Sequence, residues 1–463
     1  MTWGVPLAVL VSVLVWFAPQ PASLSLAGHH ALSLFAGVFV LYLTEAIPLA
    51  ITSLMVVPAA VLMKVVPVKE ALTGFSSTSV WLIVGAFILA SAMVKTRLAE
   101  RITWHILRTI GFTPTRVTLG ITMANIVLAF LIPSSTARTA VLLPVCLGIA
   151  SVMCGEGRTK FAINLLLTLA FTNATIGAGI LTATVPNPVT VDFLAKAGTH
   201  ITYTDWLLYG FPPALIMTFV TWFVIQRIFP PEAAREGLGE SVAHERLAEM
   251  GPTTNAEWRA FAVFILVLLG WVSGAWTKFD STVVCLVGVG LLCLPKFGVL
   301  DWPYINRHTS WQVVMVAGGG ITLGDILMKT GAAKWLAVTI FHGLGLQALG
   351  VLALLLALMV VIQYLHVVFV GTTAMATAFL PIVLALAQTA KIDPLVLVLP
   401  AGMIIGGYPV LMFYNTLPNI IIYGTGKLKV GDFPKVGVLI SFIACVVYAL
   451  CAVTYWRWLG LYS

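Results

Sequence analysis

The sequence predicts an all-α integral membrane protein with about eleven transmembrane helices, two re-entrant hairpins and two repeats of inverted topology. Hydrophobic residues make up 60% of the 463 residues and charged residues only 9%, whereas a soluble globular chain carries about 25% charged residues. Apolar runs recur from end to end and no polar stretch is long enough for a soluble domain, so residues 1–463 are expected to form a single membrane unit. Two short polar motifs of the first half also return in the second half at nearly constant spacing.

The apolar runs predict the order of the membrane segments. Transmembrane spans are expected at 5–27, 30–46, 48–66, 79–95, from 160 onward, and at 206–228, 259–276, 281–296, 311–328, from 395 onward, and 436–456. One hairpin, 116–153, follows the fourth span, and another, 350–389, follows the ninth. The arms of the first hairpin, 116–132 and 137–153, have about 17 residues each. They barely span a hydrocarbon core of about 30 Å, so re-entry from one side is favoured.

A small polar triplet marks the tip of each predicted hairpin. Ser134-Ser135-Thr136 and Gly371-Thr372-Thr373 align without a gap at an offset of 237 residues, and each precedes a stretch that ends in Leu-Pro. Irregular polar backbone at membrane depth is tolerated only where it is buried in protein or lines a wet cavity. Two such tips, one in each half, indicate the binding site of a transporter built from repeats.

A second repeated motif interrupts the spans that follow the hairpins. Thr184-Val185-Pro186-Asn187 matches Thr416-Leu417-Pro418-Asn419 at an offset of 232, and each lies about 50 residues after a hairpin tip. Proline inside a helix frees a carbonyl group and bends the helix, and each asparagine adds a donor and an acceptor. Interruptions are therefore expected around 183–188 and 415–419. For either motif alone, an ordinary kink would be the alternative; the pair favours a shared site.

These motifs divide the chain into two repeats, 30–229 with the first hairpin and 259–463 with the second. A polar cytoplasmic connector, 230–258, joins them and is expected to be a solvated linker with a short helix. Each repeat crosses the membrane five times, so the two lie upside down relative to each other. A cytoplasmic N-terminus places sixteen Lys and Arg residues inside and eight outside, with Arg138 in the site, which favours an N-inside, C-outside orientation.

The hairpin tips carry the predicted chemistry. A helix that begins at mid-membrane presents free N–H groups and the positive end of its dipole to an anion. The hydroxyl groups at the tips can donate to a carboxylate or face a cation. Helix packing is the alternative use of such small residues. The spans contain no catalytic motif and the chain no basic block, so neither an enzyme nor a nucleic-acid partner is expected. Paired gates from inverted repeats also argue against a passive anion channel.

Thr44-Glu45-Ala46-Ile47-Pro48-Leu49 resembles the T-E-A-I-P-L signature of the divalent anion:sodium symporter family, which contains dicarboxylate, citrate and sulfate transporters. The two triplets resemble the S-N-T motifs of this family, and the two interruptions resemble its T-P-P-N motifs. The resemblance covers the chain from about residue 30, in the expected order.

The resemblance implies a homodimeric elevator-type secondary transporter in the lipid bilayer, for small divalent anions and foremost C4-type dicarboxylates. It implies the bacterial inner membrane as location and no cofactor, with Na+ as the one candidate coupling ion. The substrate residues that carry over are Ser135, Thr136, Thr184, Thr372, Thr373 and Thr416, with Ser134, Arg138 and Gly371 beside them. The sodium neighbourhoods that carry over are Ser134–Ser135 with Ala183, and Gly371–Thr372 with Asn415.

Two departures from the family pattern leave the coupling open. Ser135 and Thr372 stand where the family has its central asparagine, and Arg138 stands where sodium-coupled members carry a small residue. Arginine here resembles the sodium-independent exchanger branch. The guanidinium could replace the charge of sodium or clamp a carboxylate at two points; the alternative is that it points to cytoplasmic water or headgroups. Sodium symport and exchange therefore both stay open, as does sulfate as substrate.

Three further ionisable residues have weaker predictions. Asp325 lies four residues before Lys329, which favours an ion pair between them at a helix end over a proton site. His366 precedes the second tip by five residues, and packing is favoured over titration. Glu45, within the T-E-A-I-P-L segment, is expected to have a structural role.

Overall fold

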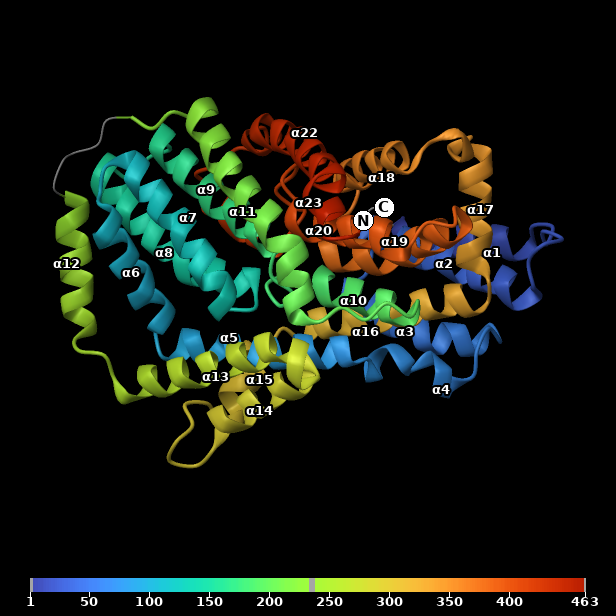
Figure 1. The fold of residues 1–463 in the computed structure, drawn as a ribbon, viewed down its shortest axis with the longest axis horizontal. Helices are drawn as coiled ribbons and strands as arrows, with labels where there is room; N and C mark the ends of the chain where they lie inside the picture. The colour runs from blue at the N-terminus through green and yellow to red at the C-terminus, as the bar shows by residue number, and fades with distance from the viewer. Residues whose placement is uncertain (1–2, 233–237, 462–463) are drawn as a thin grey trace.

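The computed structural model describes residues 3–232 and 238–461, and this part of the chain is helical throughout, without a β-strand (Figure 1). Ten of its helices are long and apolar enough to cross a membrane, and five shorter helices are apolar. Each predicted span and each hairpin arm contains one of these fifteen helices. The predicted all-α membrane fold is therefore confirmed.

The helices of the two halves follow the same order. The first half contains α2 (Leu26–Thr44), α3 (Leu49–Leu62), α4 (Val68–Ala71), η1 (Thr73–Ser76), α5 (Thr78–Lys95), α6 (Leu98–Ile110), α7 (Pro114–Leu131), α8 (Ser135–Cys154), α9 (Lys160–Gly177), α10 (Pro186–Lys196) and α11 (Tyr203–Ile228). The second half contains α13 (Asn255–Thr277), α14 (Ser281–Cys293), α15 (Trp302–His308), α16 (Trp311–Lys329), α17 (Ala332–Gly343), η2 (Leu346–Ala348), α18 (Val351–Leu365), α19 (Thr372–Thr389), α20 (Pro394–Gly407), α21 (Leu417–Tyr423) and α22 (Asp432–Val453).

Residues with left-handed backbone conformation also recur at equivalent helix ends in the two halves. Glu45 ends α2 in the left-handed region with φ 44°, and Lys278 ends α13 with φ 62°. Arg97, which precedes α6, has φ 59°, and Gly331, which precedes α17, has φ 79°. The two halves therefore share turn geometry as well as helix order.

Three α-helices of the described chain lie outside the two halves: α1 (Gly4–Phe17), α12 (Leu238–Met250) and α23 (Tyr455–Trp458). The predicted connector 230–258 contains α12, while its residues 233–237 lie outside the described part of the chain. The first span was predicted as 5–27, but its helix ends at Phe17. Ala18 has extended backbone because it precedes Pro19, which disfavours the helical conformation there.

The two hairpins approach each other from opposite ends of the molecule. Figure 1 shows α7 and α8 entering from the end that carries α12, and α18 and α19 from the end that carries α17. Both second arms, α8 and α19, begin at a tip in the centre of the molecule. Two helix N-termini from different halves of the chain are thereby brought to one place.

Each interrupted span is broken over a longer stretch than predicted, and the break begins earlier. Residues 178–185 separate α9 from α10, and residues 408–416 separate α20 from α21. Pro186, predicted inside the break, instead opens α10, and Pro418 lies in the first turn of α21. Proline is well suited to the first helical turn, because its missing N–H group would have no helical partner there.

The asparagines next to these prolines close the breaks with identical hydrogen bonds. Asn187 Nδ2 donates to the carbonyl oxygens of Gly177 at 2.8 Å and Ile180 at 2.9 Å. Asn419 Nδ2 donates to those of Pro409 at 2.8 Å and Met412 at 3.4 Å. The acceptors, like the donors, are 232 residues apart. Each asparagine thereby ties the first turn of the second helix to carbonyl groups at the start of the break.

Three consecutive glycines in α16 let the second hairpin pack closely on the first half. A Cβ on Gly319 would lie 2.0 Å from the Ser53 carbonyl oxygen in α3, and one on Gly320 would lie 2.3 Å from Thr377 Oγ1 in α19. No larger residue fits these positions without moving a helix. α16 therefore holds α3 on one side and the second hairpin on another.

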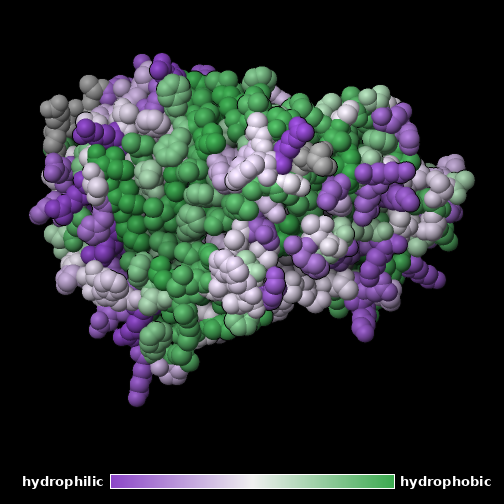
Figure 2. All heavy atoms as spheres, viewed as in Figure 1, coloured by the Kyte–Doolittle hydropathy of each residue, from purple (hydrophilic) through white to green (hydrophobic). Residues whose placement is uncertain are grey.

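The surface agrees with a lipid environment. Figure 2 shows a broad hydrophobic area over α7, α9 and α11, with hydrophilic residues at the end that carries α12. On α11, Ile216, Phe219 and Phe223 are exposed. Exposed apolar patches of this extent mark membrane or partner contacts.

The predicted Asp325–Lys329 pair is not formed. Asp325 accepts from Lys196 at 2.6 Å, while Lys329 pairs with Glu70 at 3.2 Å. Lys196 also lies 2.5 Å from Asp192, so one ammonium group joins α10 to α16. The prediction was wrong because contacts between distant helices override neighbours on the same helix.

A buried ion pair fastens α6 to the start of α13. Arg101 Nε lies 2.6 Å from Glu257 Oε1, and only 9% and 2% of the two side chains is exposed. Glu257→Gln should leave the arginine without its partner and lower the free energy of unfolding by about 3–5 kcal/mol. Equilibrium unfolding of the purified protein in detergent would measure this loss.

Glu249→Gln is the matched control, because the side chains of its pair with Arg246 are 51% and 53% exposed. Exposed pairs contribute at most about 1 kcal/mol. Equal, small effects of both substitutions would contradict a stabilising role for the Arg101–Glu257 pair.

Candidate functional site

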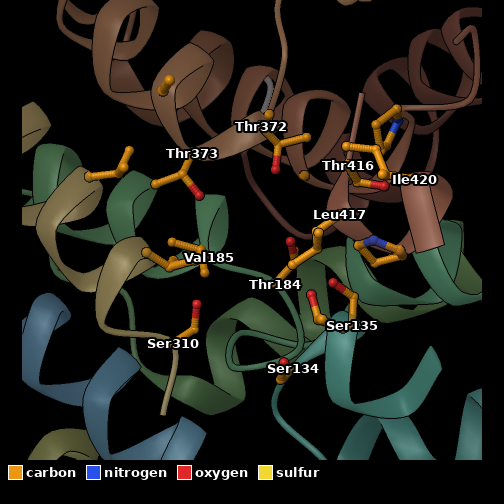
Figure 3. Close-up of a pocket in the computed structure, with 18 of the residues that line it drawn as sticks. Ser134, Ser135, Thr184, Val185, Ser310, Thr372, Thr373, Thr416, Leu417 and Ile420 are labelled. Carbon is orange, nitrogen blue, oxygen red and sulfur yellow. The ribbon is translucent and has the colours of Figure 1, made fainter. Parts of the chain in front are cut away.

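One cavity of about 240 Å³ lies where the two hairpin tips and the two breaks meet (Figure 3). Among the predicted substrate residues, those that line it are Ser134, Ser135, Thr136, Thr184, Gly371, Thr372, Thr373 and Thr416. Arg138, Ala183 and Asn415 do not line it, and of the four predicted break residues only Pro418 does. The structure therefore brings together residues that are up to 282 positions apart in the sequence, as the repeated motifs predicted.

The first tip presents the N-terminus of α8 to the cavity. Ser134 is the N-cap residue, and its Oγ accepts from the N–H group of Ala137 at 3.2 Å. Ser135 and Thr136 form the first turn, and within the described residues their hydroxyl groups have no intramolecular hydrogen bond. Free hydroxyl and N–H groups at a helix N-terminus suit an anionic oxygen.

The second tip presents the N-terminus of α19. Gly371 precedes this helix with φ 100°, a conformation that residues with a Cβ rarely adopt. No side chain in the described part of the chain caps α19, so its first N–H groups are available to a ligand. In Figure 3 the hydroxyl groups of Thr372 and Thr373 face those of Ser135 and Thr184 across the cavity.

The breaks add one threonine each. The side chain of Thr184 faces the cavity, and its hydroxyl has no partner in the described part of the chain. Thr416 is the N-cap residue of α21, and its Oγ1 accepts from the N–H group of Asn419 at 3.3 Å. The cavity wall is thus rich in donors that surround a small space, which is the arrangement a carboxylate-bearing ligand needs.

Several lining residues were not predicted to be in the site. Glu45, Ser310 and Gln312 come from the α2–α3 turn and the start of α16, and Asn173 and Tyr414 lie beside the tips. Asn173 could have been noticed as an amide within an apolar span. It has no counterpart at the repeat offset, so the comparison of the two halves gave no signal for it.

Arg138 is fully buried behind the first tip. Its Nε donates to Asn173 Oδ1 at 2.7 Å and its Nη1 to the Ile132 carbonyl oxygen at 2.8 Å. Weaker contacts reach the carbonyl oxygens of Ala183 at 3.4 Å and Asn173 at 3.3 Å. The guanidinium therefore does not point to water or headgroups, and in this conformation it forms no two-point clamp within the cavity.

The first predicted sodium neighbourhood already has a positive charge beside it. The Ala183 carbonyl oxygen, in the first break, already accepts from the guanidinium of Arg138, as does that of Ile132 beside the first tip. A second cation at these oxygens would meet a like charge. The first tip therefore carries a permanent positive charge, the guanidinium of Arg138.

The second predicted sodium neighbourhood is also hydrogen-bonded internally. Asn415 Oδ1 accepts from the N–H group of Met412 at 2.7 Å. Its Nδ2 donates to the carbonyl oxygens of His366 and, at 3.3 Å, of Phe369. Phe369 corresponds to Ile132 at the offset of 237. The amide of Asn415 therefore donates to the carbonyl group in the second half that is equivalent to the one to which the guanidinium of Arg138 donates in the first.

His366 is buried away from the cavity wall. Its Nδ1 lies 3.1 Å from the Gln363 carbonyl oxygen and its Nε2 3.2 Å from that of Ile405. These contacts join α18 to α20, in agreement with the packing role predicted for this residue. Among the residues described, no group of three or more His, Cys, Asp or Glu side chains could hold a metal ion.

Comparisons with known proteins find membrane transporters. The chain is 27% identical to the sodium-dependent dicarboxylate transporter SdcS of Staphylococcus saprophyticus, over 96% of this chain and 90% of the relative. It is 25% identical to dicarboxylate transporter 2, chloroplastic, of Spinacia oleracea, over 98% and 82%. The solved structure of MtrF from Neisseria gonorrhoeae has the same fold, with a TM-score of 0.59 at 12% identity and coverage of 96% and 94%.

Residues 1–462 match the family described as the sodium:sulfate symporter transmembrane region. This match extends over the spans, the hairpins and both breaks. The chain therefore belongs to this family of membrane transporters, and the resemblance of its motifs to divalent anion:sodium symporters is confirmed.

Proposed function

We propose that this protein is a secondary transporter that exchanges small dicarboxylates across the membrane without sodium, and that Arg138 supplies the cation in place of a sodium ion. The substrate would lie between the two tips and receive hydrogen bonds from the hydroxyl groups of the cavity. The names of the two relatives, which both specify dicarboxylates, support this substrate class over sulfate.

The observation that carries the proposal is the environment of Arg138. The side chain is fully buried, and its hydrogen bonds go to neutral oxygens. No carboxylate among the described residues forms an ion pair with it. Buried charges are costly unless they are paired, so an anion in the adjacent cavity would stabilise the protein in this region.

Exchange follows from the permanence of this charge. A sodium ion leaves the site after release of the substrate, but a guanidinium stays. An empty carrier that changed conformation would carry an uncompensated buried cation through the membrane. The conformational change would be fast only with an anion bound. Each inward movement of an anion would therefore have to be followed by outward movement of another anion.

The conformational change would be an elevator motion in a homodimer. The hairpins α7–α8 and α18–α19 and the broken spans α9–α10 and α20–α21 would move with the substrate. The remaining helices, among them α3 and α16, would stay fixed. We place the N-terminus in the cytoplasm, the C-terminus outside and the protein in a bacterial inner membrane, in accord with the distribution of Lys and Arg.

Transport into proteoliposomes tests this function. Labelled succinate or malate should enter vesicles loaded with unlabelled dicarboxylate at least about tenfold faster than empty vesicles, with or without sodium. The expected ratio reflects the cost of moving the unpaired cation, which exceeds about 1.4 kcal/mol. Dicarboxylate uptake into empty vesicles that depends on a sodium gradient would favour sodium symport, the activity that the name of the Staphylococcus relative specifies.

A further inference from the structure

Among the residues that the structure describes, Glu45 is the one charged residue that lines the cavity. It ends α2 and lies in the turn that leads to α3. Leu49, at the start of α3, approaches the second tip: a Cβ on Gly371 would lie 3.8 Å from Leu49 Cδ1. A carboxylate-bearing residue thus lines a cavity whose other polar side chains are neutral hydroxyl and amide groups.

The backbone holds Glu45 in place at some cost. The residue adopts φ 44° and ψ 35°, and its N–H group donates to the Leu41 carbonyl oxygen to end α2. Glycine suits this left-handed conformation best, and non-glycine residues there are uncommon. Residues held in such conformations cluster at functional sites, which is in accord with a role for the Glu45 side chain in the cavity.

The side chain of Glu45 has no partner among residues 3–232 and 238–461. It is exposed, and in the described part of the chain no ion pair or hydrogen bond involves its carboxylate. Its charge therefore acts across the cavity without local neutralisation. Arg138, the one basic residue among the predicted site residues, lies behind the first tip rather than in the wall.

We infer that Glu45 is a charge filter: its carboxylate disfavours each negative charge on a bound anion, so that the cavity accepts dianions and rejects trianions of similar size. This inference rests on the proposed function, because it concerns the anion that lies between the tips. Repulsion grows with the charge of the ligand, whereas a steric or structural effect of the residue would not. Removal of the carboxylate should therefore raise the binding affinity by the same factor for each negative charge on the ligand. The effect on a trianion should then be the cube of the effect on a monoanion.

The experiment compares the wild type with Glu45→Gln in equilibrium binding of a monoanion, a dianion and a trianion: monomethyl succinate, succinate and tricarballylate. Coulomb's law across about 10 Å of a wet cavity gives about a two- to threefold change per unit charge. The affinity of Glu45→Gln should thus rise about twofold for the monoanion, about fivefold for the dianion and about tenfold or more for the trianion. The three differences should shrink in high salt.

Two variants serve as controls. Glu45→Asp keeps the charge and should reproduce the wild-type order of affinities. Glu70→Gln removes a carboxylate that pairs with Lys329 outside the cavity, and should change none of the three. Equal changes for all three ligands, or no change, would overturn the charge filter while leaving dicarboxylate exchange intact. If the wild type binds none of the three anions, the proposed function fails and this inference fails with it.

Discussion

Replacing Arg138 with methionine should lower dicarboxylate exchange by about 100-fold. Methionine is the residue that the second hairpin carries at the matching position, Met375, so the helix should tolerate it. The loss corresponds to about 3 kcal/mol for a buried charge without its counterpart. Uptake into empty vesicles should at the same time become a larger share of the remaining transport, because the empty carrier then has no unpaired cation to move.

Arg138→Lys separates charge from geometry. Lysine keeps a cation but cannot donate to Asn173, Ile132 and Ala183 from one planar group. Exchange in this variant should be intermediate, and both variants should elute from a sizing column as the wild type does. Exchange in Arg138→Met at the wild-type rate, still independent of sodium, would show that the guanidinium does not support transport.

Thr136→Ala and Thr373→Ala should each reduce transport at least tenfold, and the double variant should have almost none. Each hydroxyl lines the cavity, and hydrogen bonds to charged groups contribute about 1.5–3 kcal/mol. The two residues come from different halves of the chain, so similar losses would indicate that both tips bind one ligand. Initial rates of exchange at a fixed substrate concentration measure the effect.

Thr389→Ala is the matched control in α19. Its hydroxyl donates to the Ala385 carbonyl oxygen at the far end of the helix, away from the cavity. Thr136→Ser and Thr373→Ser should retain most activity, since they keep the hydroxyl. If both alanine variants transport at the rate of Thr389→Ala, the ligand does not lie between the tips.

The fold was largely predictable from the sequence because its signals are local and repeated. Long apolar runs fix the spans, and the match of Thr184–Asn187 with Thr416–Asn419 locates the breaks in both halves. The breaks themselves begin earlier than predicted. The prolines were expected inside them, but a proline that interrupts an apolar run can equally well start the next helix.

The parts of the cavity that the sequence did not predict depend on contacts between distant helices. Ser310, Gln312 and Glu45 reach the cavity only because α16 and the α2–α3 turn pack beside the second hairpin. Likewise, Asp325 pairs with Lys196 rather than with Lys329, which is nearer in sequence. Neither residue pattern nor helical spacing carries this information.

Equilibrium binding of succinate to the purified protein, with sodium and with choline in its place, tests the central claim most directly. If the guanidinium of Arg138 supplies the cation, the dissociation constant should be the same in both salts and should rise by about 100-fold in Arg138→Met. Binding to the wild type that requires sodium, with affinity that climbs steeply as sodium is added, would contradict the account.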